Sequence, residues 1–198
     1  MTEAFGPEAL SVTLRERRRA EISNLLAPKR AAVAITLRSG AQGPEVLLMQ
    51  RVERAEDRWS GQVSFPGGKA EAEDASLLHT ALREMGEEVG LWLDEDAMIG
   101  VSDDQVAMAR GKVLPMAITP YVFELKRPNQ QLELGPEASD AFWVPLADLE
   151  SGAYDDAYQW RQGPLRHTLP CWRWRDRVIW GLTYGMLRRL LDIGRGRG

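Results

Sequence analysis

The segment from residue 61 to residue 91 constrains this chain more than any other. It reads GQVSFPGGKAEAEDASLLHTALREMGEEVGL. A short apolar run stops at Pro66 and two glycines, because proline lacks a backbone donor and glycine permits a tight turn. Apolar side chains then recur at helical spacing over residues 75–89, with Asp74 as the expected N-cap and Gly90 as the C-terminal stop. The pattern predicts a strand, a turn and an amphipathic helix.

Three glutamates of this helix, Glu84, Glu87 and Glu88, are predicted to lie together on its non-core side. Like charges at these spacings repel, and hard cations such as Mg²⁺ or Mn²⁺ favour clustered carboxylate oxygens. Arg83 precedes Glu87 by four residues, within reach of an ion pair that orients this carboxylate. The turn at Gly68 lets a main-chain carbonyl approach the same metal. An acidic helix can also be a solvated surface or a protein interface, without metal.

The ordered combination resembles the Nudix box, which runs Gly, five residues, Glu, seven residues, Arg-Glu-aliphatic-any-Glu-Glu-any-Gly-aliphatic. Residues 83–91 match every specified position, and Gly68 matches the first glycine. Asp74 replaces the first Glu, and eight residues separate it from Arg83. The resemblance implies a Mg²⁺- or Mn²⁺-dependent diphosphatase that cleaves a P–O–P bond with metal-activated water. It implies that Arg83 orients a glutamate and that the metal ligands are Gly68 (carbonyl), Glu84, Glu87 and Glu88.

Within that superfamily, the coenzyme A diphosphatase branch is the most similar. Its Gly-Gln-Val-x-Phe-Pro-Gly-Gly signature is complete at 61–68, and Arg30 opens a similar Arg-Ala-Ala-Val. Its upstream signature is half kept: Arg51 agrees, whereas Met49 replaces Thr and Arg58 lies one position closer to the glycine motif. The resemblance implies that Arg30, Arg51 and Arg58 bind substrate.

The coenzyme A interpretation gives 3′,5′-ADP and 4′-phosphopantetheine as products. The alternatives are hydrolysis of ADP-ribose, a dinucleotide or a nucleotide sugar. A non-catalytic Nudix domain that senses a nucleotide is an alternative from another class. Glu137 stands in a loop where similar proteins place another glutamate that approaches the metals. It is therefore a candidate catalytic base or further ligand, and otherwise a solvated loop residue.

The remaining pattern predicts one α/β domain over residues 29–198, preceded by a helical extension over residues 1–28. We expect an amphipathic helix at 8–26, a hairpin of strands at 31–37 and 45–51, and a closing helix at 179–193. The further expected elements are strands near 97–101, 120–125 and 141–146, a polar stretch at 102–112, a short helix or turn at 147–150 and an irregular Trp-rich segment at 151–177. The resulting prediction is a Nudix-type α/β/α sandwich, with a mixed β-sheet between helices.

Composition narrows the class of partner. The 198 residues carry 25 basic and 29 acidic side chains, a net charge of −4, so the chain lacks the basic excess of a dedicated nucleic-acid binder. Its single cysteine, Cys171, fits a reducing compartment, and no apolar run reaches the length of a membrane span. We therefore expect a cytoplasmic protein with a small-molecule substrate and neither nucleic-acid nor membrane binding. Similar proteins are often dimers, so a homodimer is a further expectation.

Overall fold

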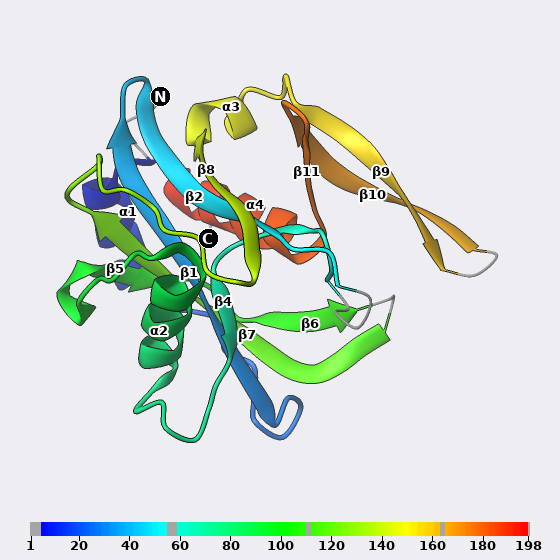
Figure 1. Cartoon of the computed structure of the whole chain (residues 1–198), viewed down its shortest axis with the longest axis horizontal. Helices are drawn as coiled ribbons and strands as arrows, with labels where there is room; N and C mark the ends of the chain where they lie inside the picture. Colours follow the sequence, from blue (N-terminus) through cyan, green and yellow to red (C-terminus); the bar gives the residue numbers. More distant parts are fainter. Residues whose placement is uncertain (1–4, 55–58, 110–111, 163–164, 198) are drawn as a thin grey trace.

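The computed structural model describes residues 5–54, 59–109, 112–162 and 165–197, and it places a mixed β-sheet between helices (Figure 1). The helices are α1 (Pro7–Glu16), α2 (Leu77–Val89), the 3-10 turn η2 (Glu95–Ala97), α3 (Leu146–Glu150) and α4 (Gly181–Gly194). The first strands are β1 (Lys29–Gly40), β2 (Gly43–Arg51), β3 (Val63–Ser64), β4 (Gly67–Lys69), β5 (Met98–Val101) and β6 (Gln105–Ala109). The later strands are β7 (Lys112–Leu125), β8 (Ala138–Pro145), β9 (Asp155–Gln162), β10 (Leu165–Trp174) and β11 (Arg177–Trp180).

The central sheet is built around β1. β1 and β2 form the predicted hairpin, which closes at the pair Gly40 and Gly43. β7 runs parallel to β1, whereas β2 and β4 pair with β1 antiparallel. β5 and β6 lie on the far side of β7, and β3 and β8 pair with β2. The mixed sheet that the sequence predicted is therefore confirmed.

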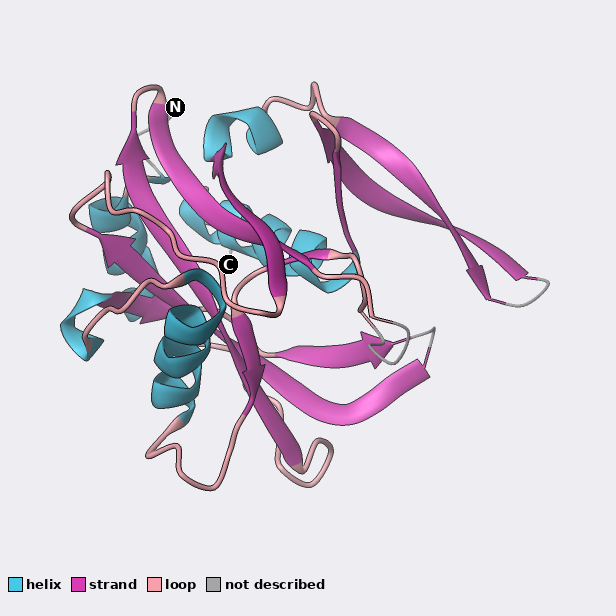
Figure 2. Ribbon diagram, in the orientation of Figure 1, coloured by secondary structure: helices cyan, strands magenta, loops and turns pink. Residues whose placement is uncertain are grey.

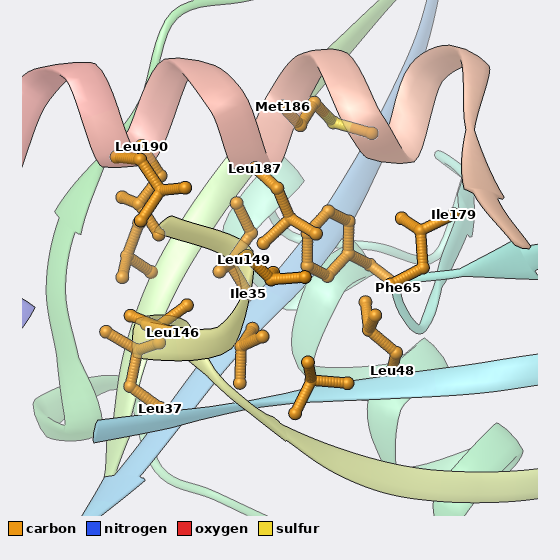
Figure 3. Packing of buried hydrophobic residues seen from close by; sticks show 14 of the residues in the cluster. Ile35, Leu37, Leu48, Phe65, Leu146, Leu149, Ile179, Met186, Leu187 and Leu190 are labelled. Carbon is orange, nitrogen blue, oxygen red and sulfur yellow. The ribbon is translucent and has the colours of Figure 1, made fainter. Parts of the chain in front are cut away.

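Helices cover both faces of this sheet. Alternate residues of β1 point to opposite faces, so each face has apolar side chains that pack against helices. Ile35 and Leu37 pack with α4 and α3 in one buried cluster, as Figure 3 shows. Ala32 and Ala34 belong to a second cluster, which contains the apolar side of α2. The expected α/β/α arrangement is confirmed.

The first helix is shorter than the sequence predicted. We expected it over 8–26, but α1 ends at Glu16 and the next residue is extended. The segment after it bonds to the loop before β6: the backbone N–H of Ala20 donates to the Asp103 carboxylate at 2.7 Å, and that of Asp104 donates to the Ala20 carbonyl at 3.0 Å. Long-range hydrogen bonds thus override helical periodicity here. α1 itself joins the main core through Leu10 and Leu14.

The C-terminal third contains a second sheet that the sequence did not predict. Residues 151–177 were expected to be irregular, but β9, β10 and β11 form a three-stranded antiparallel sheet. β9 and β10 extend from the body as a two-stranded ribbon (Figures 1 and 2). A ring stack of Tyr158 on Trp180, with centroids 4.3 Å apart, links β9 to β11. The strand β6 was also missed, within the expected polar stretch at 102–112.

Within the described residues, none of the helices has both the length and the apolar character needed to cross a bilayer.

Candidate active site

The helix α2 has well-defined ends. The Ser76 side chain accepts a hydrogen bond from the His79 backbone N–H, so Ser76 is the N-cap. The expectation that Asp74 caps the helix was wrong, because its carboxylate binds elsewhere. Gly90 ends the helix in the left-handed conformation, with φ of 69°, as its position predicted. Buried Ala81 and Met85 then fix which side of the helix faces the sheet.

The Asp74 carboxylate holds Arg83 in place. It accepts hydrogen bonds from Arg83 Nε at 2.9 Å and Nη2 at 3.1 Å, and another from the Thr80 hydroxyl at 2.8 Å. The hydrogen bonds from Arg83 lower the pKa of Asp74, and they raise the pKa of Arg83 in return. Sequence reasoning left the role of Asp74 open. Its departure from the family pattern was the available signal.

Arg83 also contacts two of the candidate metal ligands. Its Nη1 donates to Glu87 Oε2 at 3.0 Å, which is the ion pair expected from the four-residue spacing. The same nitrogen lies 3.1 Å from Glu84 Oε1. Arg83 therefore links the loop carboxylate of Asp74 to the outer glutamates of α2.

Glu88 is the buried member of the cluster. The sequence placed it on the non-core side of the helix, but its side chain is only 3% exposed. Its Oε2 accepts from the Gly67 backbone N–H at 2.8 Å, and Arg51 Nη1 lies 3.4 Å from its Oε1. Burial raises the pKa of Glu88 to about 8, although these two contacts oppose the shift. The turn and the helix thus meet at one carboxylate.

Glu84 lies against the same turn. A Cβ at Gly68 would lie 2.2 Å from Glu84 Oε1, so only glycine permits this approach of the backbone to the carboxylate. Burial also raises the pKa of Glu84, and the negative charges of Glu87 and Glu137 add to the shift. The Gly-Gly turn therefore allows the Glu84 carboxylate to lie close to the main chain.

Glu137 reaches the site from the loop before β8. Its side chain is 48% exposed, and Arg51 Nη2 lies 3.3 Å from its Oε2. Arg54 Nη1 lies 3.7 Å from its Oε1. Arg51 thus lies between Glu137 and Glu88. The tertiary structure brings together three residues that the sequence places far apart.

A cleft of about 410 Å³ opens beside these residues. Its charged lining residues are Arg51, Lys69, Glu71, Glu84 and Glu137. Many other lining side chains are apolar, among them Val33, Phe65, Met116, Ile118, Leu182 and Met186, and the neutral polar ones include Gln62, Ser64 and Thr183. Sequence reasoning missed Lys69 and the side chains from α4, although Lys69 directly follows the glycine turn.

The three candidate substrate-binding arginines differ in location. Arg51 lines the cleft, but Arg30 does not. Ala31 faces the cleft, and Arg30 points to the opposite side of β1, because neighbouring residues of a strand alternate. There the Arg30 guanidinium binds Asp104 at 3.0 Å, so the cleft gives no support to its expected substrate-binding role, which stays a prediction. Arg58 lies outside the described residues.

The site fits a hard divalent cation by its donor set rather than by a preformed cage. Among the residues with described positions, no three acidic, histidine or cysteine side chains form a ready group of metal ligands. The carboxylates contact arginines instead. Yet every available donor is an oxygen, and the negative charges of Glu84 and Glu137 add to the effect of burial in raising the pKa of Glu88. A cation of high charge density would relieve this repulsion.

Comparisons with known proteins agree with this geometry. A NUDIX domain model matches residues 28–167. The mitochondrial coenzyme A diphosphatase NUDT8 of Homo sapiens is 34% identical over 159 residues, covering 79% of this chain and 65% of the human protein. The chain thus spans slightly less than two thirds of that relative. The uncharacterized Nudix hydrolase NudL of Citrobacter koseri is 34% identical over 169 residues, covering 84% of this chain and 83% of its own.

Solved structures support the fold. An Ap4A hydrolase of C. elegans has a TM-score of 0.53 at 17% identity, covering 85% of this chain and 98% of its own. The NUDIX domain of Shewanella oneidensis NrtR, crystallised with ADP ribose, has a TM-score of 0.52 at 17% identity, covering 92% of this chain and 90% of its own. The matching domain model, the identities to the curated relatives and the shared fold show that this chain belongs to the Nudix hydrolase family.

Proposed function

We propose that this chain is a Mg²⁺- or Mn²⁺-dependent diphosphatase that hydrolyses the P–O–P bond of a nucleoside-diphosphate-type substrate, with coenzyme A as the preferred substrate. One observation carries the proposal. Glu84 of α2 and the glycine turn line one cleft together with Arg51, Lys69 and many apolar side chains. Such a lining suits a ligand that combines a diphosphate with a weakly polar arm.

The metal ligands in this proposal are Glu84, Glu87, Glu88 and the Gly68 carbonyl. A divalent cation bound there supplies positive charge to the diphosphate oxygens and lowers the pKa of bound water. Arg83 acts as a positioning residue, because it already contacts Glu84 and Glu87. Its attachment to buried Asp74 limits its own movement.

Glu137 is the proposed general base. It is half exposed at the cleft, where a carboxylate can reach water and then release a proton to solvent. Arg51 and Lys69 line the same cleft as Glu137, and they are proposed to contact the diphosphate. Arg51 now pairs with Glu88 and Glu137, so substrate binding would require it to share or exchange these contacts.

The many apolar side chains that line the cleft favour coenzyme A over a nucleotide sugar. Val33, Phe65, Met116, Ile118 and Met186 offer no hydrogen bonds to sugar hydroxyls, and the neutral polar lining residues are few, among them Gln62, Ser64 and Thr183. Burying unsatisfied hydroxyl groups costs free energy, whereas the methyl and methylene groups of a pantetheine arm gain it. The names of the NUDT8 relatives support the same choice.

The test is a panel of coenzyme A, ADP-ribose, a dinucleotide and a nucleotide sugar, with products identified by mass spectrometry. We expect 3′,5′-ADP and 4′-phosphopantetheine from coenzyme A, and loss of turnover in EDTA. Cleavage of another compound without coenzyme A would replace the substrate and keep the reaction. Ligand binding without any turnover would favour a nucleotide-sensing domain. Unchanged hydrolysis by the variant Glu87→Gln or in EDTA would contradict the metal chemistry.

A further inference from the structure

The ribbon formed by β9 and β10 has an open edge. The strand order in the second sheet is β11, β10, β9, and within the described residues no strand pairs with the outer side of β9. Half of the N–H and C=O groups of an edge strand point away from its neighbour and can pair with another chain. The ribbon also stands away from the central sheet (Figure 1). This edge is therefore accessible to a second molecule.

The charges along β9 are self-complementary. Asp155 begins the strand and Arg161 stands near its end, and both side chains are exposed. Their separation of six residues is even, so both lie on the same face of the ribbon. Neither side chain has an ion-pair partner within the part of the chain that the structure describes. Their neighbour Asp156 differs, because it binds Arg173 of β10.

A two-fold axis at Tyr158 would bring together the open edge of β9 and its complementary charges. If β9 pairs antiparallel with β9 of another copy and Tyr158 lies opposite its own equivalent, Asp155 of each copy lies opposite Arg161 of the other. Opposite charges directly across an antiparallel pair attract, and like charges repel. Two symmetric ion pairs would then lie on one face of the joined strands, and the central tyrosines would lie on the other. The stack of Tyr158 on Trp180 holds this centre in place.

We propose that β9 is the dimerisation edge of this protein and that its occupant is β9 of a second copy. The two molecules form a continuous antiparallel sheet across a two-fold axis, with Asp155 and Arg161 setting the register. Such an isologous contact closes on itself and does not grow into a filament. It covers an edge that would otherwise be open to aggregation.

Charge reversal tests the pairing. In Asp155→Arg or Arg161→Asp, both symmetric pairs become repulsive, so we expect the dimer dissociation constant to rise by about tenfold or more. The double variant Asp155→Arg/Arg161→Asp restores opposite charges and should recover the dimer. Sedimentation equilibrium measures the constants, and circular dichroism checks that each variant is folded. Lys126→Asp is the matched control, because it changes an exposed charge far from β9 in sequence and should leave the dimer intact.

A mixing experiment tests the same geometry independently. The two single variants have complementary charges, so a mixture of equal amounts should form a heterodimer, although neither variant dimerises by itself. A monomeric wild-type protein at micromolar concentration would overturn the proposal. A wild-type dimer that the single reversals leave unchanged, or a mixture that fails to associate, would also overturn it.

Discussion

The molecule contains two clusters of arginines and carboxylates, and in one the carboxylates outnumber the arginines whereas in the other the arginines outnumber the carboxylates. At the active site, five carboxylates contact one another or the arginines Arg51, Arg54 and Arg83; they are Asp74, Glu84, Glu87, Glu88 and Glu137. In the second cluster, two buried aspartates contact four arginines; these residues are Asp103, Asp104, Arg17, Arg19, Arg30 and Arg189.

The difference shows what each cluster contributes. The second cluster pairs its buried carboxylates fully: the Asp104 carboxylate also accepts from Thr119 at 2.8 Å and from the Ile22 backbone N–H at 3.0 Å. It joins the segment after α1 to the sheet, so it stabilises the fold. The active-site cluster keeps Glu88 buried and Glu84 partly buried, both with raised pKa values, which costs stability in the absence of a cation. The surplus of negative charge is the feature that suits a metal.

The variant Glu88→Gln should show the largest effect, a loss of activity without a loss of stability. We expect kcat/KM to fall by about a hundredfold to a thousandfold, because a proposed metal ligand loses its charge. We expect the free energy of unfolding to stay the same or rise, because burial already favours the uncharged form of Glu88, with a pKa of about 8, and the amide oxygen of glutamine can still accept from Gly67. Steady-state kinetics and urea denaturation measure the two quantities. Glu133→Gln, at an exposed position, is the control; a large loss of stability in Glu88→Gln would contradict this account.

Asp103→Asn should show the reverse behaviour. Its hydrogen bonds join Arg17, Arg189 and the Ala20 backbone, so we expect a loss of about 2 kcal/mol in the free energy of unfolding at neutral pH. Activity below the melting temperature should change little. Thermal and urea denaturation measure the loss, and a change below about 0.5 kcal/mol would show that the cluster is not a stabilising link.

The pH dependence of the same variant sharpens the comparison. Burial alone would raise the pKa of Asp103, but the hydrogen bonds from Arg17, Ala20 and Arg189 outweigh it and lower the pKa. The contribution to stability is therefore complete above the unfolded pKa of about 3.9 and is lost as the pH falls through the lower folded pKa. Wild-type protein should lose more stability than Asp103→Asn over this acidic range. Parallel losses in both proteins would contradict the assignment.

Asp74→Asn should give the smallest of these effects. Arg83 would lose the charged partner that fixes its guanidinium, and we expect kcat to fall about tenfold, as is typical when the support of a metal ligand is removed. KM for coenzyme A should change less than kcat, because Asp74 does not line the cleft of the proposed substrate. Asp74→Glu is the conservative comparison. A change in KM alone would place Asp74 at the substrate instead.

Local patterns could be predicted where neighbours in sequence decide the structure. The helix up to Val89, its stop at Gly90, the hairpin of β1 and β2 and the Arg83–Glu87 ion pair all follow from spacings of one to four residues or from adjacent strands. The prediction failed at residues 17–26 and 151–177, where distant hydrogen bonds or cross-strand pairing decide the conformation. Helical periodicity alone cannot weigh such contacts.

The sequence by itself therefore determined the family motif, the carboxylates on α2 and the hairpin of β1 and β2. Only the tertiary structure decided that Asp74 holds Arg83, that Glu88 is buried against the Gly67 turn and that Arg30 faces away from the cleft. These outcomes depend on which face of a strand is turned toward which layer of helices. They also depend on contacts between residues far apart in the chain. Such contacts form only when the sheet assembles, because burial and long-range pairing are properties of the packed molecule.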